Sequence, residues 1–202
     1  MLNRMKKVLA VTLAATTILG TSLTAFATTQ AASSSSSSTA ETPAVASSTV
    51  GGVKSTTRGV NYATAVTGSA VTTPAATISA AFGLAANEAP FTKFYNFDPK
   101  KSKDANKVIN DVVALIPGAV RGPSVNMEFG KMAGGKYSLL PATGAVTVSF
   151  GLPAAFSKNA KNVAVISVSE LGLALLPDLD VNPYTVTVNA PSGKSVGTII
   201  KY

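Results

Sequence analysis

The last third of the chain, residues 141–202, is a succession of short segments in which apolar and polar residues alternate. Within residues 145–150, the apolar residues Val146, Val148 and Phe150 occupy every second position. Successive side chains of a strand point to opposite faces of a sheet, so this spacing predicts a strand with one buried face. Residues 184–189 repeat the pattern, and turns rich in glycine and proline separate the segments. The region therefore predicts a β-sandwich or an open barrel.

Three other segments extend the predicted sheet. Residues 162–169 are continuously apolar and rich in β-branched side chains, which indicates a central strand buried on both faces. Residues 125–129 alternate and predict another half-buried strand. Residues 196–202 are expected to form the closing strand, at an edge of the sheet.

One amphipathic helix is predicted at about residues 102–116. Its apolar residues recur at spacings of three and four and form a single stripe, while lysine, asparagine and aspartate occupy the other side. Ser102 is a suitable cap, and Asp104 places a negative charge in the first turn, where it favours the helix dipole. Pro117 and Gly118 end the helix. The predicted fold is thus mainly β, an antiparallel sandwich or open barrel with one packed helix.

The first 27 residues have the pattern of a signal peptide. Arg4, Lys6 and Lys7 form a basic start, residues 8–23 are mostly apolar, and residues 25–27 supply the small side chains found before a cleavage site. We expect cleavage after Ala27, with no stable membrane insertion afterwards. Removal of these three basic residues and no acidic ones would lower the formal net charge from +8 to +5.

Residues 28–75 form a linker of low complexity, rich in serine, threonine and alanine. Such a composition buries too little apolar surface to offset chain entropy, so a disordered stalk is expected. Residues 71–82, at the boundary between the linker and the domain, are a candidate edge strand. A single β-rich domain is expected over residues 76–202.

The sequence contains neither histidine nor cysteine, which removes most catalytic arrangements. A Ser-His-Asp triad, a thiolate nucleophile and a His/Cys zinc site are all excluded, and no cofactor or metal is expected. Asp178 and Asp180 are two residues apart, but the prolines and asparagine around them favour a solvated loop over a pair of catalytic acids. A Ca²⁺ site with help from Asn182 is the alternative. The dispersed lysines and the predicted export argue against nucleic-acid binding.

Four aromatic residues are concentrated in residues 91–97: Phe91, Phe94, Tyr95 and Phe97. If these rings are exposed, they are candidate ligand-binding residues for a glycan or a protein partner. The favoured interpretation is different: positions 91, 95 and 97 share one strand face, and that face is expected to point into the core.

From Lys107 onward the chain resembles the non-catalytic, Ig-like β-sandwich modules of secreted surface proteins of Gram-positive anaerobes. The matching segments are Val112–Gly118, Val125–Met127, Leu140–Pro141, Gly144–Val148 and Leu152–Pro153. The resemblance implies surface scaffolding or adhesion, and no catalytic residue is implied by it.

Together these observations predict a secreted, non-enzymatic interaction or adhesion domain, loosely associated with the cell envelope. Its expected partner is a cell-wall polymer, a glycan or a surface protein. Two alternatives remain open: a carbohydrate-binding module that uses residues 91–97, and a self-assembling surface protein whose C-terminal edge strand pairs with another copy.

Overall fold

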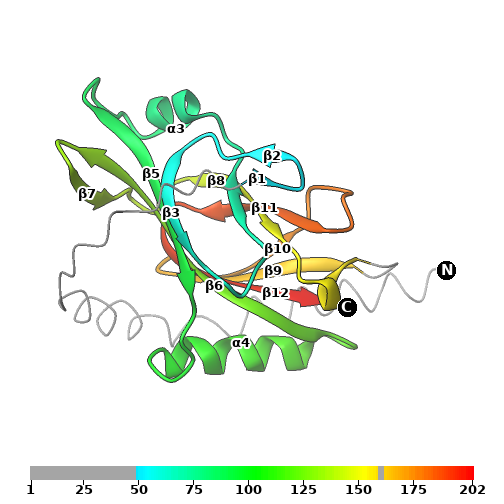
Figure 1. Ribbon diagram of the computed structural model, residues 1–202. Coiled ribbons are helices and arrows are strands. Elements are labelled where there is room, and N and C mark those ends of the chain that lie inside the picture. Colours follow the sequence, from blue (N-terminus) through cyan, green and yellow to red (C-terminus); the bar gives the residue numbers. More distant parts are fainter. Residues whose placement is uncertain (1–48, 159–161) are drawn as a thin grey trace, which may run out of the picture.

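The computed structural model describes residues 49–158 and 162–202. It places two β-sheets face to face, with one helix against the outer face of the larger sheet (Figure 1). The predicted signal peptide and residues 28–48 of the predicted linker lie outside the described residues. The elements are β1 (Thr49–Val50), β2 (Val53–Lys54), β3 (Arg58–Tyr62), β4 (Ser69–Val71), α3 (Ala75–Ala81), β5 (Glu88–Asn96), α4 (Lys103–Leu115), β6 (Val120–Ala133), β7 (Lys136–Leu139), β8 (Ala145–Gly151), the 3₁₀ helix η2 (Ala154–Phe156), β9 (Val163–Ser169), β10 (Gly172–Pro177), β11 (Thr185–Pro191) and β12 (Gly193–Lys201).

The larger sheet has seven strands in the order β10-β9-β12-β6-β5-β3, with β7 paired to the far end of β6. The smaller sheet has the order β11-β8-β4, and β1 and β2 form a separate hairpin. All of these pairs are antiparallel except β3 with β5, among the residues described. The expectation of a mainly β, mostly antiparallel fold is confirmed.

The core between the two sheets is built by the alternation seen in the sequence. Val146, Val148 and Phe150 of β8 are each at most 1% exposed, and Val186 and Val188 of the neighbouring β11 are fully buried. The two strands pair with Val148 opposite Val188, so both present their apolar faces to the larger sheet. These two predicted strands are confirmed.

Strand β9 is buried on both faces, as its continuous apolar sequence predicted. Val163 and Val165 join the core between the sheets, whereas Ala164, Ile166 and Val168 join a second core on the outer face. Because a layer covers each face, every residue of the strand is shielded from water.

Helix α4 supplies the cover over that second core. Ala105 and Ile109 are fully buried, and the remaining apolar residues of the stripe pack on β9 and β12. Arg121 of β6 donates to Asn106 and Asn110, which ties the polar edge of the helix to the sheet. The predicted helix is confirmed, although the Ser102 hydroxyl makes no capping hydrogen bond. Within the described segments, no helix combines the length and apolar character needed to cross a membrane.

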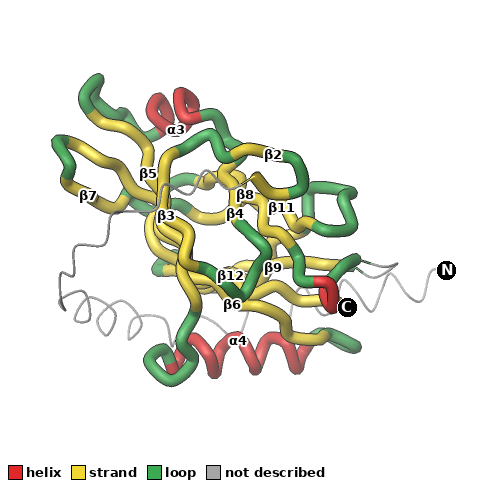
Figure 2. The backbone as a smooth tube through the Cα atoms, in the orientation of Figure 1, coloured by secondary structure: helices red, strands yellow, loops and turns green. Residues whose placement is uncertain are grey.

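The prediction of a single helix is wrong. Residues 75–81, which were considered as part of an edge strand, form α3, and Figure 2 shows it on the opposite side of the molecule from α4. Pro74 is the N-cap residue, and its carbonyl accepts the first hydrogen bond of the helix from the Ile78 amide. Ile78 is the buried side chain of the helix. Strand β4 ends earlier, at Val71, and is the edge strand of the smaller sheet.

The prediction of a disordered linker as far as residue 75 is also wrong for residues 49–75. Ala70 and Val71 are fully buried, Val50 is 2% exposed, and β3 lies parallel to β5 along five residue pairs. Small side chains permit this close approach. A Cβ added at Gly59 would lie 2.3 Å from the carbonyl oxygen of Thr92. The small residues of this segment, which are also typical of a linker, allow its strands to pack closely against the rest of the sheet.

We expect Gly59→Val to lower the free energy of unfolding by about 1–3 kcal/mol, because the new side chain would push β3 away from β5. Urea unfolding followed by circular dichroism would measure the change. Val53→Ala, in the same segment at a side chain that is 44% exposed, is the control and should stay within about 0.5 kcal/mol. Equal stability of Gly59→Val and the parent protein would contradict the β3–β5 pairing.

The C-terminal strand is not at an edge. β12 pairs with β6 on one side and with β9 on the other, so it lies in the middle of the larger sheet. The chain crosses from the smaller to the larger sheet at Ser192, whose hydroxyl donates to the carbonyl of Pro141 (2.6 Å) and accepts from the Gly144 amide (3.1 Å). The prediction of an edge strand ending at Tyr202 is therefore wrong. Among the residues described, the strand order ends at β10 and β3, and β7 is a further edge strand because it pairs with β6 alone.

Candidate functional site

The four aromatic residues of the 91–97 segment do not form one surface. Phe94 is 3% exposed and lies in the core between the sheets, edge-on to Phe129 (6.0 Å between ring centroids) and Phe150 (5.8 Å). Phe91 and Tyr95 point to the opposite face of β5, and Phe97 packs against the second core beneath α4. Phe94 is therefore not exposed for ligand binding, and the rings of Phe91, Tyr95 and Phe97 are partly buried.

The prediction that positions 91, 95 and 97 face the main core is wrong. The three do share a face, but Pro90, Thr92 and Phe94 form the face that is buried between the sheets. The alternation fixes which residues share a face of the strand, whereas the position of the second sheet decides which of the two faces is buried.

On the outer face of β5, β6 and β12, charged and aromatic side chains form a connected group. Tyr95 donates a hydrogen bond to Glu128, and Lys194 lies 3.6 Å from the same carboxylate. Lys93 lies over the ring of Tyr137 on β7 (3.6 Å from Nζ to the ring centroid), and Phe91 meets that ring edge-on. Most polar groups here bind one another. The exception is the Tyr137 hydroxyl, which is buried without a partner among the described residues.

Both tyrosines of this group are held in the neutral form. Burial raises the pKa of Tyr95 far above its usual value, and the hydrogen bond to Glu128 raises it further. Burial and the charge of Glu128 likewise raise the pKa of Tyr137. Neither phenol is therefore activated as a nucleophile or a base.

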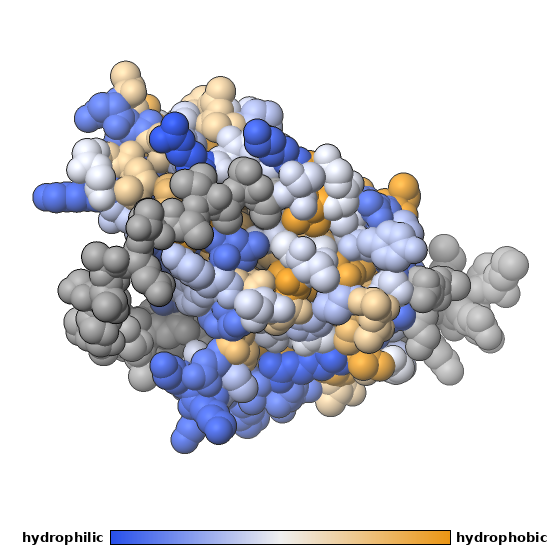
Figure 3. All heavy atoms as spheres, in the orientation of Figure 1, coloured by the Kyte–Doolittle hydropathy of each residue, from blue (hydrophilic) through white to orange (hydrophobic). Residues whose placement is uncertain are grey.

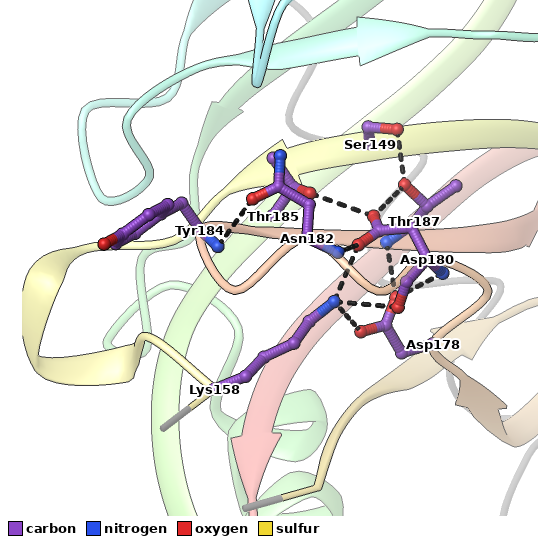
Figure 4. Close-up of polar contacts among 8 residues, drawn as sticks. All are labelled: Ser149, Lys158, Asp178, Asp180, Asn182, Tyr184, Thr185 and Thr187. Carbon is purple, nitrogen blue, oxygen red and sulfur yellow. Dashed lines mark hydrogen bonds and ion pairs between the residues drawn. The ribbon is translucent and has the colours of Figure 1, made fainter. Parts of the chain in front are cut away.

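A second polar group joins the two sheets at their side, around Lys158 (Figure 4). The Lys158 ammonium lies 2.6 Å from Oδ2 of Asp178 and 2.6 Å from Oδ1 of Asp180, and it donates to the backbone carbonyl of Asp180 at 2.9 Å. The three side chains are 15%, 11% and 25% exposed. An ammonium has three protons, so Lys158 is fully engaged.

The carboxylates of this group also bind the outer edge of β11. Asp178 Oδ1 accepts from the Thr187 amide (3.0 Å), and the Leu179 amide donates to the Thr187 carbonyl (2.8 Å). Asp180 Oδ2 accepts from the hydroxyls of Thr185 and Thr187, and Thr187 in turn shares a hydrogen bond with Ser149. Residues 178–180 thereby cover the free edge of the smaller sheet. Figure 4 shows Tyr184 pointing away from the group.

The prediction of a solvated loop at Asp178 and Asp180 is wrong, because both acids are mostly buried and ion-paired. Burial opposes ionisation of Asp180, but the hydrogen bonds from Lys158, Thr187 and Thr185 outweigh it and lower its pKa. The Asn182 side-chain oxygen accepts a hydrogen bond from the Tyr184 amide, and the Asn182 backbone amide donates to Oδ1 of Asp180. The described residues include no group of three or more potential acidic, histidine or cysteine metal ligands. Here Lys158 occupies the position at which a cation would compensate the two charges.

Beside this group, the surface carries an apolar strip that sequence analysis did not single out. We define it by five exposed side chains between residues 171 and 184: Leu171 (66%), Leu175 (47%), Leu179 (53%), Val181 (98%) and Tyr184 (66%). They follow the β9–β10 turn, strand β10 and the loop to β11. On the face drawn in Figure 3, hydrophilic residues dominate along α4, and apolar residues reach the surface on the side where Figure 1 has this loop.

The composition of residues 171–177 indicates part of this apolar strip. Residues 171–177 contain four leucines and no charged residue, which is the composition of a buried strand. The structure shows that β10 is an edge strand, so part of this apolar surface stays in water. No matching family model, curated protein or solved structure was found in comparisons with known proteins.

Proposed function

We propose that this chain is an exported, non-enzymatic protein that binds a partner at the cell envelope, and that the apolar strip is its contact surface. The observation that carries the proposal is the concentration of five large apolar side chains, each 47–98% exposed, within residues 171–184. Clusters of exposed apolar side chains on a soluble protein often mark an interaction site.

The rest of the proposal is supported by the chemistry of the chain. The sequence lacks histidine and cysteine, and both carboxylates of its pair of neighbouring aspartates are already engaged by Lys158. The basic start and the apolar run of residues 1–27 support export. The formal charge of +5 expected after cleavage favours attraction to anionic wall polymers, which is a weak and salt-sensitive effect.

The location can be tested with the full 202-residue chain expressed in a Gram-positive host. Medium, wall and membrane fractions are separated, and the protein is measured by intact mass. We expect protein in the medium and the wall fraction, beginning at Thr28. A protein that keeps residues 1–27 and stays in the membrane fraction would contradict export with cleavage.

The contact surface can be tested by pull-down on purified Gram-positive cell walls at low and high salt. We expect a salt-resistant part of the binding, and we expect Leu179→Ser with Val181→Ser to reduce it at least about tenfold, because apolar contact is not screened by salt. The matched control is Leu139→Ser with Val120→Ser, at side chains that are 46% and 52% exposed elsewhere on the surface.

The salt series and the comparison of the two double variants distinguish apolar contact from attraction by net charge. Binding that disappears entirely at high salt would mean that only net charge acts, and the proposed contact surface would be wrong. The same conclusion follows if the Leu179/Val181 variant and the Leu139/Val120 control bind equally well.

A further inference from the structure

Strand β10 leaves one edge of the larger sheet open. Within residues 49–158 and 162–202, β9 is the only strand hydrogen-bonded to it. The corresponding edge of the smaller sheet is covered, because residues 178–180 bind the outer side of β11. At the other end of the strand order, β3 begins with Arg58 and contains Asn61. Strand β7, which pairs with β6 alone among the described residues, begins with Lys136. In contrast, β10 contains no polar side chain. Natural edge strands are usually protected by charge, proline or a covering segment, and β10 has only Pro177, at its last position.

The hydrogen-bonding groups of β10 that point outward follow from its pairing. Ser169 and Gly172 flank a two-residue turn and are the first pair, and opposite residues then alternate between hydrogen-bonded and non-hydrogen-bonded pairs. Leu173 and Leu175 therefore direct both their amides and their carbonyls away from β9. Ala174, between them, directs its groups to Ser167.

We propose that β10 pairs antiparallel with β10 of a second copy, about a two-fold axis through Ala174. Leu173 of each copy then lies opposite Leu175 of the other, and the two pairs exchange four backbone hydrogen bonds. The spacing is self-complementary, as a two-fold interface requires. This pairing rests on the proposed function, since it names a second copy as an occupant of the apolar strip.

The side chains fit such a pairing. Leu173 packs against the core under α4 and Leu175 is 47% exposed on the same face. In the dimer, Leu173 and Leu175 of the two copies come together and extend that core across the interface. The opposite face of the strand presents Ala174, whose small side chain permits close approach.

The charged residues near β10 do not oppose its pairing with a second copy. The chain as a whole is strongly cationic, but β10 has no charge. The nearest acids are Glu170 in the turn and Asp178 after the strand. These two would approach each other across the interface, where the Lys158 ammonium of the same chain lies 2.6 Å from the Asp178 carboxylate and compensates part of its charge. A second copy can therefore approach without an unshielded pair of like charges.

Sedimentation velocity on the full chain, in the form that its expression host yields, tests the pairing from about 10 µM to about 1 mM, because a short interface gives a weak dimer. We expect the sedimentation coefficient to rise with concentration toward that of a dimer. Leu175→Lys places two lysines in the interface and should weaken dimerisation at least about tenfold. Leu115→Lys is the matched control, since Leu115 is 48% exposed on α4, and it should dimerise like the parent.

A parent protein that remains monomeric at about 1 mM would overturn the pairing, as would a Leu175→Lys variant that dimerises as well as the control. The wall pull-down distinguishes this failure from failure of the proposed function. If the protein is a monomer but still binds walls through Leu179 and Val181, only the proposed dimer is wrong. If it dimerises but binds no wall, only the proposed envelope partner is wrong.

Discussion

Replacing Phe94 with alanine is expected to destabilise the protein by about 3–5 kcal/mol, one of the two largest effects of any single substitution considered. The ring is 3% exposed and meets Phe129 and Phe150 edge-on between the sheets. Its removal leaves a cavity that the surrounding strands cannot fill, because β5 is held by β6 on one side and by β3 on the other. Urea unfolding would measure the change, and the Tm should fall by about 10 °C or more.

The matched control is Phe91→Ala, on the opposite face of the same strand. Phe91 is partly buried and meets the ring of Tyr137 edge-on, so its loss should cost less than half as much. The comparison also tests the glycan hypothesis for this segment. Unchanged stability of Phe94→Ala, together with lost retention on a glycan column, would make Phe94 a ligand-binding residue and contradict its position in the core.

Replacing Lys158 with methionine is expected to lower the free energy of unfolding by about 2–4 kcal/mol. The substitution leaves Asp178 and Asp180 as two mostly buried carboxylates with no cation between them. These acids also hold residues 178–180 against β11, so the closure of the two sheets at this side should weaken. Chemical denaturation at pH 7 would measure the loss.

Lys107→Met is the control for this change, because Lys107 pairs with Asp111 on the exposed surface of α4, where the two side chains are 77% and 59% exposed. Exposed pairs contribute little, so its effect should stay within about 0.5 kcal/mol. Adding Asp178→Asn and Asp180→Asn to Lys158→Met should restore part of the stability, because the uncompensated charges disappear. Equal stability of Lys158→Met and Lys107→Met would show that the ion pairs do not hold the loop.

The stabilisation at Lys158 should depend on pH in a defined direction. The pKa of Asp180 is lower in the folded chain than its ordinary value. The stabilising contribution is therefore fully present above the ordinary carboxyl pKa of about 4, and it is lost as the pH falls through the lower, folded pKa. The difference in unfolding free energy between the parent and Lys158→Met should shrink as the pH falls below about 4. A difference that grows on acidification would contradict this.

Several elements could be predicted because local pattern and tertiary environment agree. The alternation at residues 145–150 has one register that buries Val146, Val148 and Phe150, and the structure adopts it. The continuous apolar run of β9 requires cover on both faces, and the stripe of α4 supplies one of those covers. In each case a single arrangement removes the apolar side chains from water.

The candidate sites were less predictable, because they depend on contacts between residues far apart in the sequence. Nothing in the sequence near Asp178 indicates that its partner is Lys158, because strands β9 and β10 separate the two residues along the chain. The spacing of residues 91–97 showed which rings share a face, but not that the second sheet lies on the side of Phe94. The lack of charge in β10 was visible in the sequence, whereas its place at an edge was not.

The sequence by itself determined the strands at β8, β9 and β11, the amphipathic helix α4, and which catalytic groups the chain lacks. Tertiary structure alone decided the order of the strands, the central place of β12 between β6 and β9, and the folding of residues 49–75. The reason is the range of the interactions. Side-chain period and turn residues act over a few positions, whereas small residues such as Gly59 and Ala70 gain their role only when another strand comes close enough to need them.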